Sequence, residues 1–336
     1  GKLLNQLIQK FEAEHPNIDV RFEVINSQYP DVIRTRLIGG VAPDVFYLDA
    51  YEAPLFMKSG VLEPLNSYIK PEFNLNDFEP RLLNAFKQGE TLYGIPKDFS
   101  TLGLFYNKAA FKQAGLTRPP QTWEELRQYA KKLTIDTNKD GKIDRFGMGF
   151  LPELPRQVFM MKAFGGSLVD RNNNAAFAAP ESLKGLQLVV DQYRRDRTAA
   201  LPSDVGANSN TDAFGQGSVA MAIDGAWAIP HLKETFPKTE FAIAPIPSIN
   251  GRPGTMAYTV AYAINRESKH KEAAWKLIQF LTSANGMKTW ANQGVALPSR
   301  RSVLEALRYD RNPLYAPLAN GAKYATIWQA GETLPT

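Results

Sequence analysis

The chain contains no cysteine, and only three of its 336 residues are histidine. The absence of cysteine excludes disulfides, zinc–thiolate sites and cysteine nucleophiles. The histidines, at positions 15, 231 and 270, lie far apart, and no HExxH spacing occurs. A chain without cysteine fits an exported bacterial protein, although the absence alone does not establish export.

The sequence also lacks any apolar run near the 18 residues that predict a membrane-spanning helix. No signal peptide with a basic first region stands at its start, so a leader has been removed or was never part of this chain. Low-complexity linkers and internal repeats are absent as well. Hydrophobic residues make up 44% and charged residues 22%, a composition typical of globular proteins with room here for two domains.

Neither sign of charge dominates, because 39 Lys and Arg are interspersed with 34 Asp and Glu, for a net charge of +5. Basic residues cluster only around residues 194–197 and 300–301. This pattern predicts a mildly basic surface and argues against a nucleic-acid-binding stripe.

The first fifty residues alternate helix and strand patterns. Apolar residues recur at helical spacing over 3–14, which predicts a helix, and alternate strictly over 18–24, which predicts a strand. A second helix is expected over 30–38, before the buried strand 45–48. This order predicts an α/β layer with parallel strands, whose ligands bind beyond the carboxyl ends. Asp49, Tyr51 and Glu52 follow the strand and are pocket candidates. The alternative for Asp49 is the N-cap of the next helix.

Three further places put polar or aromatic groups beside strands. Asp98 and Ser100 precede the apolar strand 102–106 and either bind a ligand in a cleft or merely form a turn. Glu153 is the only charged residue in a loop fixed by two prolines. Trp227 follows Gly225 at the end of the strand 219–223, where it enters a cleft or packs in the core.

The segment 136–144, DTNKDGKID, has the spacing of oxygen ligands in a calcium-binding loop. The expected ligand residues are Asp136, Asn138, Asp140, Lys142 and Asp144. The twelfth position, where a bidentate Glu is expected, is Gly147, so a closing carboxylate would have to come from elsewhere. The alternative is a polar hairpin loop without metal.

Four segments together resemble one protein family. They are PDVFYLDAYEAPLFMKSGVLEPL, GIPKDFSTLGLFYNKAAFKQAGL, SVAMAIDGAWAIPHL and AYTVAYAINRESKHKEAAWKLIQFLTSANGMKTWANQGVALPSRRSVL. In this order they are similar to the extracellular solute-binding proteins of ATP-driven sugar importers, including those for maltose, trehalose and oligosaccharides. Each segment alone is a weak signal, but four in the family's order form a specific one.

The resemblance implies two α/β lobes of the periplasmic-binding-protein fold, each a mostly parallel sheet flanked by helices, with a ligand cleft between them. The expected N-terminal lobe is 1–106 with 264–310, and the expected C-terminal lobe is 107–263 with 311–336. The family begins with a strand before the first helix and continues beyond residue 328. We therefore expect this chain to be trimmed at both ends.

The resemblance also implies a sugar site. By position, Trp227 matches a stacking tryptophan of the family, and Glu153 matches a carboxylate that binds sugar hydroxyls. The two groups suit a sugar, because a carboxylate accepts hydrogen bonds from its hydroxyls and an aromatic ring covers its C–H face. The full set of expected ligand-binding residues is Asp49, Tyr51, Asp98, Ser100, Glu153, Trp227, Tyr258 and Arg300.

The implied function is a transport receptor without catalysis, which closes on a di- or oligosaccharide or a glycoside and delivers it to the membrane permease of an ABC importer. We expect a monomer that is periplasmic or extracellular. One way to hold it at the membrane would be a lipid anchor on an N-terminal segment that this chain lacks. No nucleic acid and no cofactor other than structural calcium are expected. The alternative is a glycoside hydrolase using paired carboxylates, although no nucleophile elbow is present.

Overall fold

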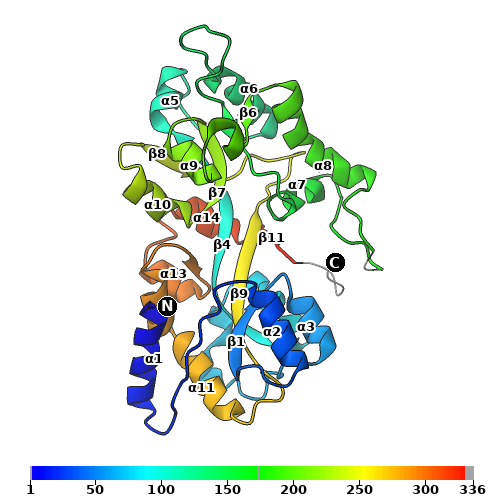
Figure 1. The fold of residues 1–336 in the computed structure, drawn as a ribbon, viewed down its shortest axis with the longest axis vertical. Helices are drawn as coiled ribbons and strands as arrows, with labels where there is room; N and C mark the ends of the chain where they lie inside the picture. Colours follow the sequence, from blue (N-terminus) through cyan, green and yellow to red (C-terminus); the bar gives the residue numbers. More distant parts are fainter. Residues whose placement is uncertain (1, 173, 330–336) are drawn as a thin grey trace. The chain divides into compact units, whose positions relative to one another are not determined.

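The computed structural model describes residues 2–172 and 174–329. It contains two compact units. Unit 1 holds the residues up to Phe99, Tyr258–Leu307 and Gln329, and unit 2 holds Ser100–Ala257 and Arg308–Trp328. Two strands, β4 (Gly94–Asn107) and β9 (Met256–Ile264), each have residues in both units (Figure 1). The lobe boundaries expected from the sequence lie near these divisions and stay a prediction. The part of the expected C-terminal lobe from residue 330 onward lies outside the described residues.

Unit 1 begins with helices and closes with a helical return segment. Besides its parts of β4 and β9, its elements are α1 (Lys2–Glu14), α2 (Tyr29–Ile38), β1 (Val45–Asp49), α3 (Ala53–Ser59), η1 (Pro71–Phe73), η2 (Leu75–Asp77), α4 (Pro80–Asn84), β2 (Lys87–Gln88), β3 (Thr91–Leu92), α11 (Lys271–Leu281), α12 (Ala284–Ala291), β10 (Leu297–Pro298) and α13 (Arg301–Ala306). In Figure 1, α2 and α3 lie on the other side of β1 from α1 and α11.

The sheet of unit 1 is held by antiparallel ladders. β1 pairs with β9, with Leu48 opposite Ala261, and β10 pairs with β4. The helix α1 buries Leu7 and Phe11, and the ring of Phe11 meets that of Phe280 on α11 at 5.5 Å. Each such large apolar side chain contributes about 1.5–3 kcal/mol to folding when fully buried. The helices expected over 3–14 and 30–38 are therefore confirmed.

The alternating segment 18–24 does not form the expected strand. Val20 donates its backbone N–H to Oε1 of Glu12 at 2.8 Å rather than to a neighbouring strand, and the side chain of Val24 is 57% exposed. Alternation predicts a strand only where a ladder partner takes up the backbone groups and a surface covers the apolar face. The segment has no ladder partner in the described residues, and its apolar residues Ile18, Val20 and Phe22 are only half-buried.

Unit 2 contains the middle of the chain. Besides its parts of β4 and β9, its elements are α5 (Lys108–Gln113), α6 (Trp123–Leu133), β5 (Met148–Gly149), η3 (Leu154–Arg156), α7 (Val158–Ala163), α8 (Pro180–Val190), the π-helix η4 (Asp191–Arg195), β6 (Ala199–Ala200), η5 (Pro202–Val205), α9 (Asn210–Gly215), β7 (Met221–Gly225), α10 (Ala228–Thr235), β8 (Phe241–Ala244), α14 (Ala316–Gly321) and β11 (Thr326–Ile327).

Strand pairing in unit 2 is mixed. β4 pairs antiparallel with β7 and with β8, and Leu104 lies opposite both Ile223 and Ala244. β5 pairs parallel with β6 and β7, and β11 pairs parallel with β9. The α/β class is thus confirmed, but the expectation of mostly parallel sheets is wrong for the described ladders. The reason is that β4 runs opposite to β10, β7 and β8, and that β9 runs opposite to β1.

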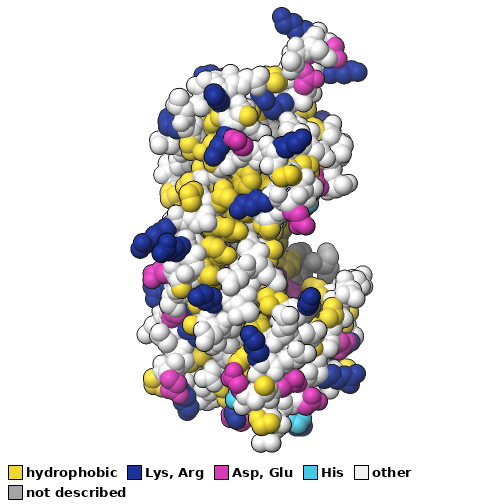
Figure 2. All heavy atoms as spheres, turned by 90° about the vertical axis from the view of Figure 1, so that its left-hand side faces the viewer, with side chains coloured by type: hydrophobic (Ala, Val, Ile, Leu, Met, Phe, Trp, Pro, Cys, Tyr) yellow, Lys and Arg dark blue, Asp and Glu magenta, His cyan; other side chains and the backbone are white. Residues whose placement is uncertain are grey.

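The surface carries charges of both signs. On the face that Figure 2 shows, Lys and Arg side chains are interspersed with Asp and Glu. Among the described residues, no helix combines the length and the apolar character that crossing a membrane requires.

Candidate functional site

The site in unit 2 begins where two parallel strands end. Gly149 of β5 lies opposite Ala222 of β7, and the two strands run in the same direction. Glu153 follows β5, whereas Asp224 closes β7 together with Gly225. Because parallel strands end at the same edge of a sheet, the polar groups that follow them come together there.

Arg156 links the groups at this edge. Its Nε lies 3.3 Å from Oε2 of Glu153, and its Nη1 lies 3.5 Å from Oδ1 of Asp224 and donates to the carbonyl of Ile223 at 3.4 Å. Its guanidinium carbon lies 5.7 Å from the ring centroid of Trp227, within the range of a cation–π contact. One side chain therefore connects both predicted site residues, Glu153 and Trp227.

Trp227 stands at the N-cap of α10 with its ring against the end of β7. A Cβ at Gly225 would come within 2.3 Å of Cζ3 of this ring, so only glycine leaves the ring its place. Trp227 is half-buried, in contrast to the core residue Trp123, which is 1% exposed. The backbone N–H of Ala226 donates to Oγ of Ser100 at 3.2 Å and ties the loop before Trp227 to β4.

Asp224 is buried, with 2% of its surface exposed, and its carboxylate accepts hydrogen bonds from unit 2. Oγ1 of Thr211 donates to Oδ2 at 2.6 Å, and the backbone N–H of Gly225 donates to Oδ1 at 3.0 Å. Thr211 lies on α9, whose neighbouring Asn210 donates from Nδ2 to the carbonyl of Ile223 at 3.2 Å. These bonds fix the carboxylate that faces Arg156.

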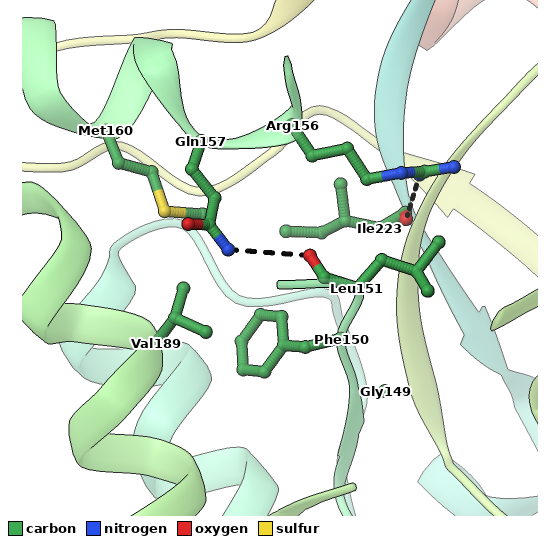
Figure 3. A pocket seen from close by; sticks show the side chains of 8 residues that line it. All are labelled: Gly149, Phe150, Leu151, Arg156, Gln157, Met160, Val189 and Ile223. Carbon is green, nitrogen blue, oxygen red and sulfur yellow. Dashed lines mark hydrogen bonds between the residues drawn. The ribbon is translucent and has the colours of Figure 1, made fainter. Parts of the chain in front are cut away.

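A pocket adjoins this cluster in unit 2 (Figure 3). Its cavity volume is about 10 Å³, the space of about one water molecule, and apart from Arg156 it is lined by uncharged residues: Gly149, Phe150, Leu151, Gln157, Met160, Val189 and Ile223. Nε2 of Gln157 donates to the carbonyl of Leu151 at 3.4 Å across one side of it. The pocket thus offers apolar walls beside the charged cluster.

Unit 1 contains a second polar and aromatic cluster, around Asp98. Nε1 of Trp290 donates to Oδ2 of Asp98 at 2.7 Å, and Lys97 forms an ion pair with the same oxygen. Nζ of Lys97 also lies 4.3 Å from the ring of Trp290 and 5.1 Å from that of Tyr47. Asp98 is 8% exposed, so this carboxylate is part of a built arrangement and not of a free turn.

The residues after β1 form a turn with a buried acid. The backbone N–H of Tyr51 donates to Oδ1 of Asp49 at 2.8 Å. The next helix, α3, has Glu52 at its N-cap, so the alternative role of Asp49 as that cap is wrong. Burial raises the pKa of Glu52, and the nearby Asp49 raises it further. Tyr51 and Tyr258 are half-buried in unit 1.

Arg300 lies inside unit 1, where only 5% of it is exposed. Its Nε donates to the carbonyl of Thr282 at 2.6 Å, and its Nη2 donates to the carbonyl of Phe73 at 2.9 Å. Its guanidinium carbon lies 4.2 Å from the ring of Phe78, and burial lowers its pKa. This guanidinium connects segments of unit 1, and a ligand role for it stays a prediction.

The loop 136–144 folds with its acceptors turned to its own backbone. Asp136 Oδ2 accepts from the N–H of Gly141 at 2.9 Å, and Asp144 Oδ2 accepts from that of Thr137 at 2.6 Å. A Cβ at Gly147 would lie 2.1 Å from the carbonyl oxygen of Ala130, so no side chain can close the loop from this position. Over 2–172 and 174–329, no three His, Cys, Asp or Glu side chains are grouped to hold a metal ion. Asp136 Oδ1, however, is buried without a hydrogen-bond partner.

Residues 1–288 match the family model of the bacterial extracellular solute-binding proteins. The chain belongs to this family. The resemblance read from the four sequence segments is thereby confirmed.

The relatives of this solute-binding protein are distant but extend over most of its length. A binding protein of Brucella abortus (strain 2308) is 27% identical over 97% of this chain and 80% of its own. The mannitol-binding protein of Pseudomonas aeruginosa is 28% identical over 87% of this chain and 69% of its own. Among solved structures, an ABC transporter solute-binding protein from Thermotoga lettingae bound to α-D-tagatose has a TM-score of 0.78 at 26% identity, covering 97% of this chain and 85% of that one.

The two candidate clusters, one in each unit, include residues that were not among the ligand-binding residues expected from the sequence. They are Arg156 and Asp224 in unit 2, and Lys97 and Trp290 in unit 1. Arg156 stands three residues after Glu153, a spacing that could have indicated a pair. Trp290 lies 192 positions from Asp98, and nothing in the sequence joins them. The ligand roles of the predicted residues stay predictions.

Proposed function

We propose that this protein is the substrate-binding receptor of an ABC importer and that its ligand is a sugar or polyol, bound without turnover. The observation that carries the proposal is the convergence of Glu153, Asp224 and the ring of Trp227 on Arg156. Carboxylates accept hydrogen bonds from hydroxyls, and an aromatic ring covers a C–H face of a sugar. The names of two relatives, which bind mannitol and α-D-tagatose, support the same class of ligand.

The proposal includes transport by closure. Two units joined by β4 and β9 would close on the ligand, and a membrane permease would recognise the closed form. We propose that the receptor acts as a monomer in the periplasm or outside the cell. Small-angle scattering with and without the bound sugar would detect the compaction, and an unchanged radius at saturation would count against closure.

The experiment that tests the function is identification of the ligand. Freshly purified protein would be denatured and its released small molecules identified by mass spectrometry, and calorimetric titration with the identified compound would give its affinity. Recovery of the sugar unchanged after long incubation supports a receptor. Cleavage of an oligosaccharide by wild type, lost in Glu153→Gln, would instead support a glycoside hydrolase.

We propose, as a separate property, that the loop 136–144 binds Ca²⁺ through Asp136, Asn138, Asp140, Asp144 and the carbonyl of Lys142. Oxygen ligands at this spacing suit Ca²⁺. The buried Oδ1 of Asp136, which has no hydrogen-bond partner, supports the proposal. Bound Ca²⁺ would replace the backbone N–H groups that these oxygens now accept from, and it would fasten the loop between α6 and β5.

A further inference from the structure

The chain contains three Asn-Gly pairs, at positions 250–251, 285–286 and 320–321. In such a pair the peptide nitrogen of the glycine can attack the side-chain amide of the asparagine, because glycine has no Cβ to hinder the approach. The structure places the three pairs in different surroundings. We propose that Asn250 is a site of spontaneous deamidation, and that its modification detaches the turn 249–252 from helix α7.

The pair at 250–251 forms the tip of a two-residue hairpin turn. The N–H of Ile249 donates to the carbonyl of Arg252 at 3.0 Å, and the N–H of Arg252 donates back at 2.9 Å. Asn250 has a φ of 51° and Gly251 a φ of 70°, the left-handed backbone that Asn-Gly favours in such turns. Both residues are exposed, so water and hydroxide reach the side-chain amide and the peptide bond that follows it.

The other two pairs lie in helices that bury their glycine. The pair at 285–286 belongs to α12, and the pair at 320–321 belongs to α14. Gly286 and Gly321 are both buried, and the N–H of Gly286 also donates to Oγ of Ser283 at 3.1 Å. A peptide nitrogen held in a helix against the core cannot turn toward the preceding side chain without local unfolding. The fold therefore protects two of the three pairs.

The reaction at the exposed pair needs only water as co-reactant. The nitrogen of Gly251 loses its proton to solvent hydroxide and attacks Cγ of Asn250. The bond from Cγ to the side-chain nitrogen then breaks, and this nitrogen takes up a proton from water and departs as ammonia. The cyclic imide that remains adds water. Opening at Cγ leaves aspartate at position 250, and opening at the main-chain carbonyl carbon leaves isoaspartate, whose main chain passes through the former side chain.

Modification should affect α7, because Asn250 connects the turn to that helix. Its Nδ2 donates to the carbonyl of Ala163, the last residue of α7, at 3.1 Å. A carboxylate at this position is ionised at neutral pH and has no proton to donate. It would repel the carbonyl oxygen, which is also an acceptor. The turn would then lose its hydrogen bond to α7, and isoaspartate would lengthen the main chain of the turn as well.

Peptide mapping by mass spectrometry, after incubation of the full chain at mildly alkaline pH, measures the modification. The peptide with residues 249–252 should change from the mass of an amide to that of a carboxyl group at least about tenfold faster than the peptides with Asn285 or Asn320. Equal rates for the three peptides, or no conversion of Asn250, would overturn the proposal.

The same chain in denaturant is the control for the fold. All three pairs then share one environment, so their rates should become similar. A preference for Asn250 that persists in denaturant would show that the neighbouring sequence, and not the fold, selects this pair.

Two variants test the consequence for α7 by thermal unfolding. Asn250→Asp reproduces one product, and Asn250→Gly removes the side chain at a position whose backbone suits glycine. Both should melt below wild type, and Asn250→Asp should melt lowest, because it adds repulsion to the loss of the hydrogen bond. Asn285→Asp, the same change at an exposed position in the first turn of α12, is the matched control and should not lower the melting temperature. A wild-type melting temperature in Asn250→Asp, or an equal loss in Asn285→Asp, would overturn the proposed detachment.

Discussion

The ring of Trp227 lies directly against the backbone of Gly225, two residues before it. A Cβ at Gly225 would stand 2.3 Å from Cζ3 and 2.4 Å from Cη2 of the ring. The contact brings an aromatic face to the end of β7, beside the carboxylate of Asp224 and the guanidinium of Arg156. The orientation of the ring therefore depends on the absence of a side chain at one position.

Gly225→Ala should displace this ring and weaken sugar binding by about tenfold or more. The clash involves the far end of a side chain that can rotate away, so the melting temperature should fall little. Calorimetric titration gives the affinity, and thermal unfolding gives the stability. An alanine variant that binds like wild type would show that the ring position is unimportant.

Trp227→Ala and Glu153→Gln should each weaken binding at least about tenfold and leave the fold intact. Loss of a stacking ring should cost about 1.5–3 kcal/mol, and loss of a charged acceptor about 1.5–3 kcal/mol. Trp123→Ala provides the contrast, since Trp123 is a core residue and its loss should lower the melting temperature strongly. If Trp227→Ala unfolds the protein as Trp123→Ala does, and Glu153→Gln binds normally, the site is misplaced.

The parts of the fold that the sequence predicts well are those set by local patterns. Glu153 and Trp227 each follow a short apolar strand, and parallel pairing of β5 with β7 brings the strand ends together as expected. The length of β4 was not predictable in this way. Pro96 lies inside this strand although proline is rare in paired strands, and the apolar run indicated only residues 102–106.

Contacts between distant segments are the part that the sequence does not reveal. The bond from Trp290 to Asp98 joins α12 to β4, and Arg156 reaches Asp224 across 68 positions. Such pairs depend on the register of the sheets and on helix packing. A pattern read over a window of residues has no access to either.

Trp290→Phe should destabilise unit 1 by about 1.5–3 kcal/mol, the range for a lost hydrogen bond to a charged group. The ring against Lys97 is largely kept, so the loss reports mainly on the N–H that donates to Asp98. Denaturant unfolding measures the change. Trp123→Phe is the comparison variant, because Trp123 belongs to unit 2 and its buried Nε1 has no hydrogen-bond partner. Equal stability of Trp290→Phe and wild type would contradict a stabilising role for this bond.

Chelation should lower the melting temperature if the loop 136–144 holds Ca²⁺, and added Ca²⁺ should restore it. Asp140→Asn with Asp144→Asn should abolish this response, because two charged ligands are lost from the site. Elemental analysis of the purified protein is the direct measurement. Protein that contains no metal and does not respond to chelator would establish the loop as a polar hairpin.

The loss of folding stability at acidic pH should depend on Glu125, which lies near the start of α6. The Arg118 guanidinium, which binds both carboxylate oxygens, and to a smaller extent the backbone N–H of Gln121 together lower the pKa of Glu125 from 4.5 to about 2. Because the folded-state pKa is depressed, the stability that this carboxylate contributes is present above about pH 4.5 and is lost as the pH falls towards 2. Glu125→Gln should therefore be less stable than wild type at neutral pH, and the difference should disappear by about pH 2.

Denaturant unfolding over this pH range measures the difference in stability, with Glu124→Gln as the control at the exposed position just before Glu125. Because the pair lies at the surface, the difference should also shrink in high salt. A constant difference between Glu125→Gln and wild type at every pH would mean that the loss comes from packing of the side chain and not from its charge.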